Sequence, residues 1–552
     1  MPTLSPYNKT MEYLYSLERL GIHLGLARMK AILKSLDNPQ DKLNIIHVGG
    51  TNGKGSTSAM IESILMKTGY KVGLYTSPHL FRFNERIRVN GREIPDRKIA
   101  ELVERIRQRV EAKVEAKAKA KESPNLSLNL TFFEFTTAMA FLYFAEEKVD
   151  IAVMEVGLGG RLDATNVGKP LVSVITNIAK DHESILGGRI SDIAFEKAGI
   201  IKRGGILISG ETKPAALKVL NSACKKKGAV FYRLDRDFFI EQWSNGATEQ
   251  RRNRKADSSA PSLGWVPPRF PDSLTFHLSP FTFTGRRWVY KNLQINLLGR
   301  HQHLNAACAL AAAEVLEEKG YTIPEIAVRK GLASVYWPGR LEIVSRRPLI
   351  VLDCAHNPAG AEVLREALLD LRFTIYELRI PPPLSPSGGG QGEENRKSKI
   401  VNHKLYKRLF LVLGIMADKD IKGIVLKLAP LAHTVILTRP KTERAASLEM
   451  LYQEIMELRI TNYDLRIEGT TPLPPLIRGN NRKSKILNRK LKIMLIEDVA
   501  DACRTTVSMA NADDIICVSG SVFTVGEARE AFRQLQIENC KVQNIKLKKG
   551  KP

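Results

Sequence analysis

The chain has 552 residues, of which 43% are hydrophobic, and a formal net charge of +26 at pH 7. A chain this long exceeds what one hydrophobic core usually organises, so two or more domains are expected. The apolar runs are far shorter than the ~20 residues that cross a bilayer, and the first ten residues lack the order of a secretory signal. These features argue against a membrane-spanning or secreted protein, and we expect a cytoplasmic one.

The excess positive charge gathers in Lys/Arg clusters at 113–121, 396–408 and 478–492. These clusters are poor in aromatic residues, so solvated surfaces are favoured over nucleic-acid binding. The six cysteines form no CxxC pair and are predicted to be reduced structural thiols.

Short apolar segments alternate with helical patterns along the first half, which is typical of a mostly parallel sheet wrapped by helices. Strands are expected there at 44–48, 71–76, 150–156, 171–177 and 205–209. The same alternation of apolar segments and helical patterns recurs in the second half, with strands expected at 349–353, 409–413, 434–438 and 515–519. We therefore predict two α/β domains, 1–336 and 337–552.

Three stretches interrupt this rhythm and are predicted to be disordered surface insertions: 242–272, 379–405 and 470–490. The last two share the sequences PPL and NRKSKI, which indicates a duplicated insertion.

A glycine-rich segment, GGTNGKGS at 49–56, follows the first strand and opens a helical pattern at 57–68. Glycines let backbone N–H groups close around a phosphate, the helix N-terminus attracts negative charge, and Lys54 adds a cation. Gly55 stands where the common phosphate loop has a Ser or Thr that binds magnesium. A metal must therefore find other ligands.

Polar residues at three other strand ends are candidate ligands, because open parallel sheets bind ligands at the carboxyl ends of their strands. Glu155 and the pair Asp181-His182 follow two strands of the first half. Taken alone, Glu155 would be a solvent-exposed strand end and His182 a hydrogen-bonded structural residue. Asp353 is either a third strand-end carboxylate or the N-cap of a helix that follows Pro358.

Eleven sequence blocks run in order between Tyr13 and Arg533, among them VGGTNGKGS, TSPHLFRFNERIRV, EVGLGGRLDATN, LDCAHNPAGA, LGIMADKD and SGSVFTVGE. With these blocks the chain resembles the folylpolyglutamate synthase/dihydrofolate synthase family of Mur-ligase-like amide ligases. The resemblance implies an α/β fold in which a mostly parallel, P-loop-containing sheet domain precedes a smaller Rossmann-like α/β domain. It also implies ATP, bound between the domains, and Mg²⁺ as cofactors.

The resemblance assigns roles to matching positions. The phosphates of ATP would be held by Asn52, Gly53, Lys54, Gly55 and Ser56, with further nucleotide contacts from Asn305, Arg340 and Asp353. Magnesium would be bound by Ser77, Glu155 and His182. Catalytic roles fall to Lys54, Lys197, His182 and His356, with Lys197 carried as a carbamate. Without the resemblance, Lys197 would be a helical lysine that faces solvent.

The acceptor side centres on 77–88, interpreted as a mobile-looking loop rich in Phe and Arg. Aromatic faces can stack on a pterin, and arginine can pair with a carboxylate. The candidate substrate residues are Arg28, Arg82, Phe133, Leu162, Asp163 and Ala164.

The resemblance implies a monomer that joins L-glutamate to dihydropteroate or a folate through an acyl phosphate, without nucleic-acid or membrane partners. Two alternatives stay open at this point. One is a related ligase with another acceptor, such as a muramyl compound. The other is a P-loop ATPase that binds nucleic acid through its basic loops.

Overall fold

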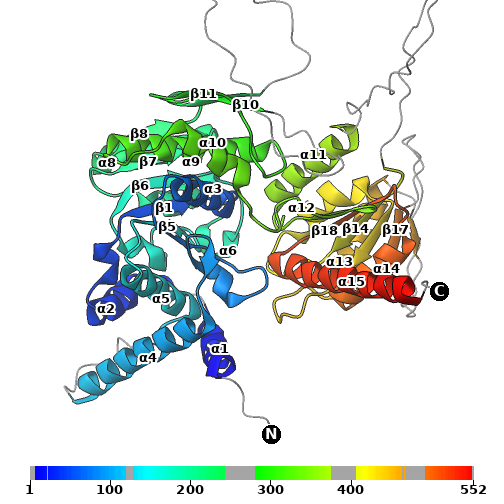
Figure 1. Ribbon diagram of the computed structural model, residues 1–552, viewed down its shortest axis with the longest axis horizontal. Helices are drawn as coiled ribbons and strands as arrows, with labels where there is room; N and C mark the ends of the chain where they lie inside the picture. Colours follow the sequence, from blue (N-terminus) through cyan, green and yellow to red (C-terminus); the bar gives the residue numbers. More distant parts are fainter. Residues whose placement is uncertain are drawn as a thin grey trace, which may run out of the picture.

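The computed structural model describes residues 6–21, 23–119, 129–242, 280–374, 406–462, 465–467 and 491–549 (Figure 1). Apart from Gln242, the three predicted insertions lie outside the described residues, so their disorder stays a prediction. No helix in the described ranges is long and apolar enough to cross a membrane.

Among the described residues of the first half, eight strands form one sheet in the order β4-β3-β2-β5-β1-β6-β7-β8. The six strands from β2 to β8 in this order are parallel, and β3 and β4 form an antiparallel edge. The strands are β1 Ile45–Gly49, β2 Val72–Tyr75, β3 Ile87–Val89, β4 Arg92–Glu93, β5 Ile151–Glu155, β6 Pro170–Ile175, β7 Ile206–Ser209 and β8 Val230–Arg233.

Helices cover both faces of this sheet because successive residues of a strand point to opposite sides. Ile46 and Val48 join the core beneath one helical layer, whereas Ile45 joins the core of the other. The first layer contains α3 Lys54–Lys67, α9 His301–Glu318 and α10 Glu325–Ser334. The second contains α1 Pro6–Ser16, α2 Ala27–Ser35, α4 Asp96–Lys119, α5 Phe132–Glu146, α7 Ile190–Lys197 and α8 Pro214–Lys227.

The segment 77–88 is more regular than the loop expected from the sequence. The Glu85 carboxylate accepts hydrogen bonds from the backbone N–H groups of Leu80, Phe81 and Arg82. These bonds cap a short 3₁₀ helix, Phe83–Arg86, which leads directly into β3.

A separate three-stranded antiparallel sheet, β9 Phe239–Gln242, β10 Phe281–Thr284 and β11 Val289–Leu293, lies over α9. Buried Glu314 of α9 accepts hydrogen bonds from the backbone of Arg287 and Trp288, at 3.0 and 2.8 Å. This contact fixes the β10–β11 turn.

In the described part of the second half, seven strands are ordered β12-β13-β18-β14-β15-β17-β16, with only β12 antiparallel. They are β12 Glu342–Arg346, β13 Leu349–Leu352, β14 Leu409–Leu413, β15 Thr434–Leu437, β16 Leu465–Ile467, β17 Leu491–Leu495 and β18 Ile515–Ser519. One face packs on α11 Pro358–Thr374, α12 Ile421–Leu428 and α13 Leu448–Asn462, the other on α14 Val499–Met509 and α15 Val522–Lys549. The predicted fold class is confirmed.

The two sheets turn the carboxyl ends of their central strands toward a common cleft. In the first sheet these ends are the Gly49 end of β1 and the Glu155 end of β5, and in the second sheet Asp353 follows β13. The chain passes from one half to the other through 335–341, beside the same cleft.

Candidate active site

A cleft of about 360 Å³ lies between the two halves. It is lined by every residue that the sequence assigned to catalysis, nucleotide or metal: Asn52, Gly53, Lys54, Gly55, Ser56, Ser77, Glu155, His182, Lys197, Asn305, Arg340, Asp353 and His356. The six candidate substrate residues do not line it. The structure thus brings the first group together and leaves the second group apart.

The glycine loop has little room for side chains. Gly53 has a φ of 82°, and a Cβ there would lie 2.2 Å from Oδ1 of Asn305. A Cβ at Gly55 would lie 2.8 Å from the indole Nε1 of Trp337. This packing explains why a glycine, and not Ser or Thr, follows Lys54. The helix α3 begins at Lys54, so its N-terminal N–H groups face the cleft.

Two lysines donate to the backbone of this loop. Lys54 Nζ donates to the carbonyl of Thr51 at 3.0 Å, and Lys197 Nζ donates to the carbonyl of Gly50 at 2.8 Å. Lys197 is only 4% exposed, so the solvent-facing alternative does not hold. Burial, assisted by the charge of Lys54, lowers the pKa of Lys197 to about 7. A large fraction of its amine is therefore uncharged at neutral pH.

Glu155 is buried and not a solvent-exposed strand end. Its carboxylate accepts the backbone N–H of Ser77 at 3.1 Å. Burial raises the pKa of Glu155, against the opposing charge of Lys54. The nearby Ser56 hydroxyl is buried without a hydrogen-bond partner among the described residues.

These groups fit a magnesium ion bound together with phosphates. Within the described ranges, no three His, Cys, Asp or Glu side chains form a group that could hold a metal on its own. Mg²⁺ commonly takes one or two protein ligands and completes its shell with phosphate oxygens and water. The Ser77 hydroxyl and the Glu155 carboxylate are oxygen donors of that kind, and a divalent cation would offset the buried carboxylate charge.

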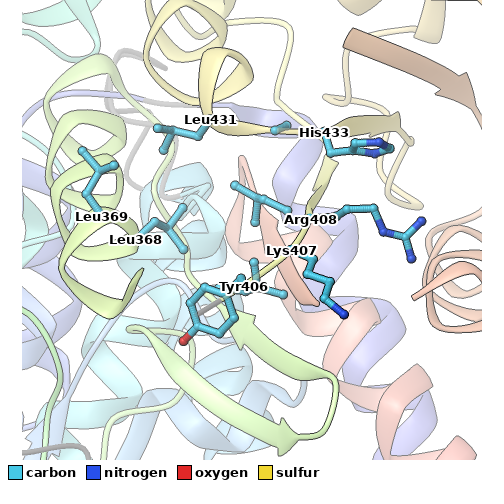
Figure 2. A pocket seen from close by; sticks show the side chains of 10 residues that line it. Leu368, Leu369, Tyr406, Lys407, Arg408, Leu431 and His433 are labelled. Atoms are coloured by element: carbon cyan, nitrogen blue, oxygen red, sulfur yellow. The ribbon is translucent and has the colours of Figure 1, made fainter. Parts of the chain in front are cut away.

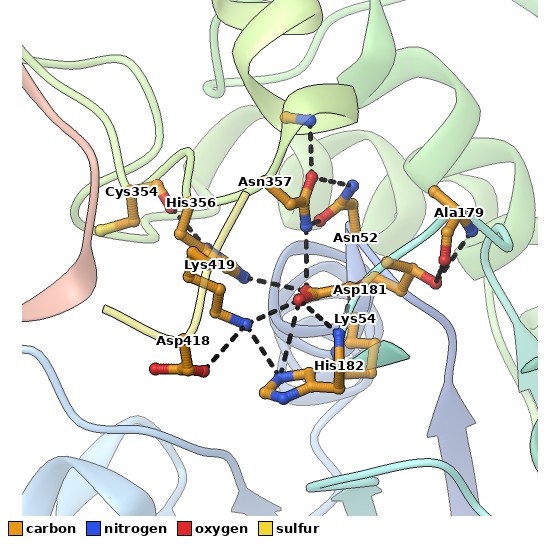
Figure 3. Close-up of polar contacts among 12 residues, drawn as sticks. Asn52, Lys54, Ala179, Asp181, His182, Cys354, His356, Asn357, Asp418 and Lys419 are labelled. Atoms are coloured by element: carbon orange, nitrogen blue, oxygen red, sulfur yellow. Dashed lines mark hydrogen bonds and ion pairs between the residues drawn. The ribbon is translucent and has the colours of Figure 1, made fainter. Parts of the chain in front are cut away.

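Asp181 is the centre of a polar cluster that joins the two halves (Figure 3). Lys419 Nζ donates to its Oδ1 at 2.6 Å, and Asn357 Nδ2 donates to its Oδ2 at 3.0 Å. His356 Nε2 lies 3.5 Å from the same Oδ2. Burial alone would raise the pKa of Asp181, but the His356 hydrogen bond and the Lys419 charge lower it well below its usual range.

His182 accepts from the same lysine, because its Nε2 lies 3.1 Å from Lys419 Nζ and an ammonium group can only donate. Burial lowers the pKa of His182 to about 4, which agrees with a neutral ring. On the other side, His356 Nδ1 donates to the carbonyl of Cys354 at 2.8 Å. That bond leaves His356 Nε2 directed at Asp181.

A reciprocal pair of amides also crosses the cleft. Asn357 Nδ2 donates to Asn52 Oδ1 at 3.0 Å, and Asn52 Nδ2 donates to Asn357 Oδ1 at 3.2 Å. The phosphate loop is therefore bonded directly to Asn357, the residue that precedes α11 and accepts the backbone N–H of Gly360.

Asp353 does not cap α11. Its carboxylate accepts the backbone N–H groups of Leu341 and Ala355 at 3.0 and 2.9 Å, and burial raises its pKa. Arg340 is partly exposed beside it and donates to the carbonyl of Gly339. Asp353 thus fixes the connection between the halves at the cleft wall.

The two candidate substrate arginines are already paired. Arg28 Nε lies 3.0 and 3.1 Å from the two carboxylate oxygens of buried Glu134. Arg82 pairs with Asp96 at 2.9 Å on the exposed surface. A substrate carboxylate would have to compete with Glu134 or Asp96.

The remaining candidate substrate residues lie on or beside the loop after β5. Asp163 accepts from the backbone of Leu158 and Thr165, so it holds that loop closed. Phe133 fills the space beside Gly157, where a Cβ would come within 2.3 Å of its ring. Leu162 is partly exposed and Ala164 is buried.

A second pocket, shown in Figure 2, lies at the amino ends of the strands in the second sheet. None of the predicted site residues lines it. Its two cations are engaged, since Lys407 pairs with Asp513 and Arg408 with Asp514. We assign no chemistry to this pocket.

The sequence assignments missed two cluster residues and one buried arginine. Asn357 and Lys419 stand inside the blocks LDCAHNPAGA and LGIMADKD, so the blocks gave a signal for both. Asp181 was a candidate ligand from its strand end, but the resemblance gave it no role. Within 77–88 the buried arginine is Arg86, not Arg82. Arg86 donates to His79 Nδ1 at 2.8 Å and stacks on Phe132 at 5.1 Å.

Comparisons with known proteins agree with this architecture. The Mur ligase middle domain model matches residues 99–313, and the Mur ligase glutamate ligase domain model matches residues 398–522. The chain is 31% identical over 530 residues to dihydrofolate synthase/folylpolyglutamate synthase of Bacillus subtilis, covering 96% of this chain and 99% of the relative. It is 30% identical to the enzyme of the same name from Escherichia coli, with 96% of each covered.

Two solved structures are similar over nearly the whole chain. Mycobacterium tuberculosis folylpolyglutamate synthase complexed with ADP and AMPPCP has a TM-score of 0.72 and 28% identity, with 96% of this chain and 99% of that chain covered. Escherichia coli FolC in complex with DHPP and ADP has a TM-score of 0.69 and 28% identity, with 97% and 100% covered. The chain belongs to the folylpolyglutamate synthase/dihydrofolate synthase family of Mur-type ligases.

Proposed function

We propose that this protein uses ATP to join L-glutamate to a folate-type carboxylate, either dihydropteroate, a reduced folate, or both. The observation that carries the proposal is the interdomain cleft, where a glycine loop, two lysines and a buried carboxylate meet residues of the second half. The names and bound ligands of the relatives support the same substrates.

ATP would lie with its phosphates on the loop 52–56. Lys54 would leave the Thr51 carbonyl to contact them, and Asn305, packed against Gly53, would contact the nucleotide beside the loop. Arg340 and Asp353 would close on it from the second half. Ser77, Glu155 and His182 would hold Mg²⁺, which offsets charge on the phosphates when bound.

Amide formation from a carboxylate needs activation. An oxygen of the acceptor carboxylate attacks the γ-phosphorus, the bond to the β-phosphate oxygen breaks, and ADP leaves. The glutamate amine then attacks the acyl carbon and expels phosphate, giving the amide after loss of a proton from nitrogen. Lys54 stabilises the transferring phosphoryl group, and approach of the second half excludes water from the acyl phosphate.

Lys197 is proposed to carry a carbamate. Its uncharged amine can attack CO₂, forming an N–C bond and releasing a proton to solvent. The buried position and a pKa of about 7 support this step, because the reactive form is populated at neutral pH. The negative group formed would help to place the metal and the acceptor.

We also propose a domain boundary at 336/337, which β12 supports because it begins at Glu342. We likewise propose that the six candidate substrate residues contact the acceptor: Arg28, Arg82, Phe133, Leu162, Asp163 and Ala164. The monomeric state implied by the resemblance and the cytoplasmic location expected from the sequence stay predictions.

Phosphate release tests the function, measured with ATP, magnesium and glutamate while the acceptor is varied. Turnover with dihydropteroate would establish dihydrofolate synthase activity, and turnover with tetrahydrofolate would establish polyglutamylation. Turnover only with a muramyl acceptor, or ATP hydrolysis stimulated by polynucleotide, would contradict the proposal.

A further inference from the structure

Lys419 belongs to the second half of the chain, but its side chain contacts a pair of residues in the first half. It follows β14 in the segment 414–420, and its side chain, 7% exposed, reaches the Asp181-His182 pair (Figure 3). Asp181 is also largely buried, with a 9% exposed side chain. Nothing in the proposed reaction so far uses this lysine.

The ammonium group makes two contacts of different kinds. At 2.6 Å from Asp181 Oδ1 it neutralises a buried carboxylate. At 3.1 Å from His182 Nε2 it uses the lone pair of a neutral imidazole, which is the electron pair that would bind a metal ion. The Lys419 ammonium thus occupies both the carboxylate of Asp181 and the lone pair of His182, the two groups at this edge of the cleft that could otherwise bind a divalent cation.

We propose that Lys419 is a positioning residue that takes the place of the divalent cation at His182 until the metal–nucleotide complex binds. Metal binding to His182 displaces the ammonium, so that metal binding and the contact between the two halves are coupled. This inference rests on the proposed function, because it takes His182 as a metal ligand.

The charges around Asp181 give the direction of the effect. Without Lys419, the carboxylate keeps Asn357, His356 and the backbone N–H of His182 as partners, and none of these is a permanent cation. His182 would at the same time regain a free lone pair. Both changes raise the affinity of the site for a divalent cation. The amide pair Asn52–Asn357 would still join the two halves.

Mn²⁺ binding to the ADP-loaded protein, followed by electron paramagnetic resonance of free Mn²⁺, tests the proposal without turnover. The variant Lys419→Met is compared with Lys180→Met. Lys180 stands one residue before Asp181, is 60% exposed and pairs with Glu183, so its replacement changes the net charge equally. We expect about tenfold tighter Mn²⁺ binding in Lys419→Met and less than about a twofold change in the control. Unchanged or weaker binding in Lys419→Met would overturn the proposal.

A measurement on the unaltered protein removes any dependence on folding of the variant. With ¹⁵N at lysine Nζ, the buried Lys419 ammonium should give a slowly exchanging signal in metal-free protein. Saturating Mg²⁺ and ADP should abolish that signal, and its persistence would overturn the proposal. Neither experiment contains acceptor or glutamate, so failure of the proposed ligase reaction would leave both results unchanged.

Discussion

The two walls of the cleft hold their functional groups in different ways. On the first wall, Lys54, Lys197 and Glu155 are each bonded to backbone of their own domain, at Thr51, Gly50 and Ser77. On the second wall, Asn357 and Lys419 are bonded across the cleft. These three groups of the first wall are therefore preformed, whereas Asn357 and Lys419 acquire their contacts only when the halves meet.

The largest effect is expected on the preformed wall. Lys54→Ala should lower turnover by roughly a thousandfold or more, because a cation at the phosphates is lost. Thermal unfolding should change little, since the partly exposed lysine contributes a single hydrogen bond, to the Thr51 carbonyl. Lys67→Ala, at the exposed end of the same helix, is the control. Near-normal turnover of Lys54→Ala would remove the phosphate-loop assignment.

Lys197 links activity to pH and stability. Its pKa is about 7 in the folded protein and 10.5 ordinarily, so the unfolded chain binds more protons between these values. Stability should therefore rise as pH increases from 7 toward 10.5. Lys197→Met should flatten this rise in urea denaturation and lower turnover by about a hundredfold.

Depletion of CO₂ should lower wild-type turnover as well, and an unaffected rate would contradict the carbamate.

On the second wall, Asn357→Ala should act mainly on binding. It removes both amide bonds to Asn52 and one to Asp181. We expect the KM for ATP to rise roughly tenfold or more, since each of the three lost hydrogen bonds contributes about 1 kcal/mol and about 1.4 kcal/mol corresponds to a factor of ten. Small-angle scattering should detect a more open pair of domains. If kcat alone fell and the scattering profile did not change, Asn357 would instead belong with the preformed groups of the first wall.

The smallest effect on activity is expected behind the phosphate loop. Burial raises the pKa of Glu62, in α3, to about 7 from 4.5. The folded state then binds more protons between these values, so stability should fall as pH rises through this window. Glu62→Gln should remove the decline, which is on the order of 2 kcal/mol, with turnover unchanged. Denaturation curves at pH 5 and 8 check this, and parallel curves for both proteins would contradict it.

Local patterns predicted several strands and the phosphate loop of the first wall, whereas Glu155 and Lys197 received their roles from the family resemblance. Apolar runs placed β14 and β18 at their observed bounds, and the glycine pattern placed the phosphate loop between β1 and α3. The β3–β4 edge was missed because the ordering contacts of Glu85 are made to backbone, which no hydrophobic period reveals.

Contacts between distant residues were out of reach of such patterns. Arg28 pairs with Glu134, 106 positions away, and Lys419 with Asp181, 238 positions away. Burial of Lys197 depends on the whole α7 environment and could not be read from a short helix. The resemblance located most cleft residues, but it gave no information on which groups pair across the cleft.

The most direct test of the ligase reaction follows oxygen atoms. An acceptor labelled with ¹⁸O in its carboxylate is incubated with ATP, magnesium and glutamate, and the released phosphate is analysed by mass spectrometry. Activation through an acyl phosphate predicts one ¹⁸O in each phosphate and one in the new amide. Phosphate without ¹⁸O, released at the rate of ATP consumption, would show that ATP is hydrolysed by water and would contradict the proposed reaction.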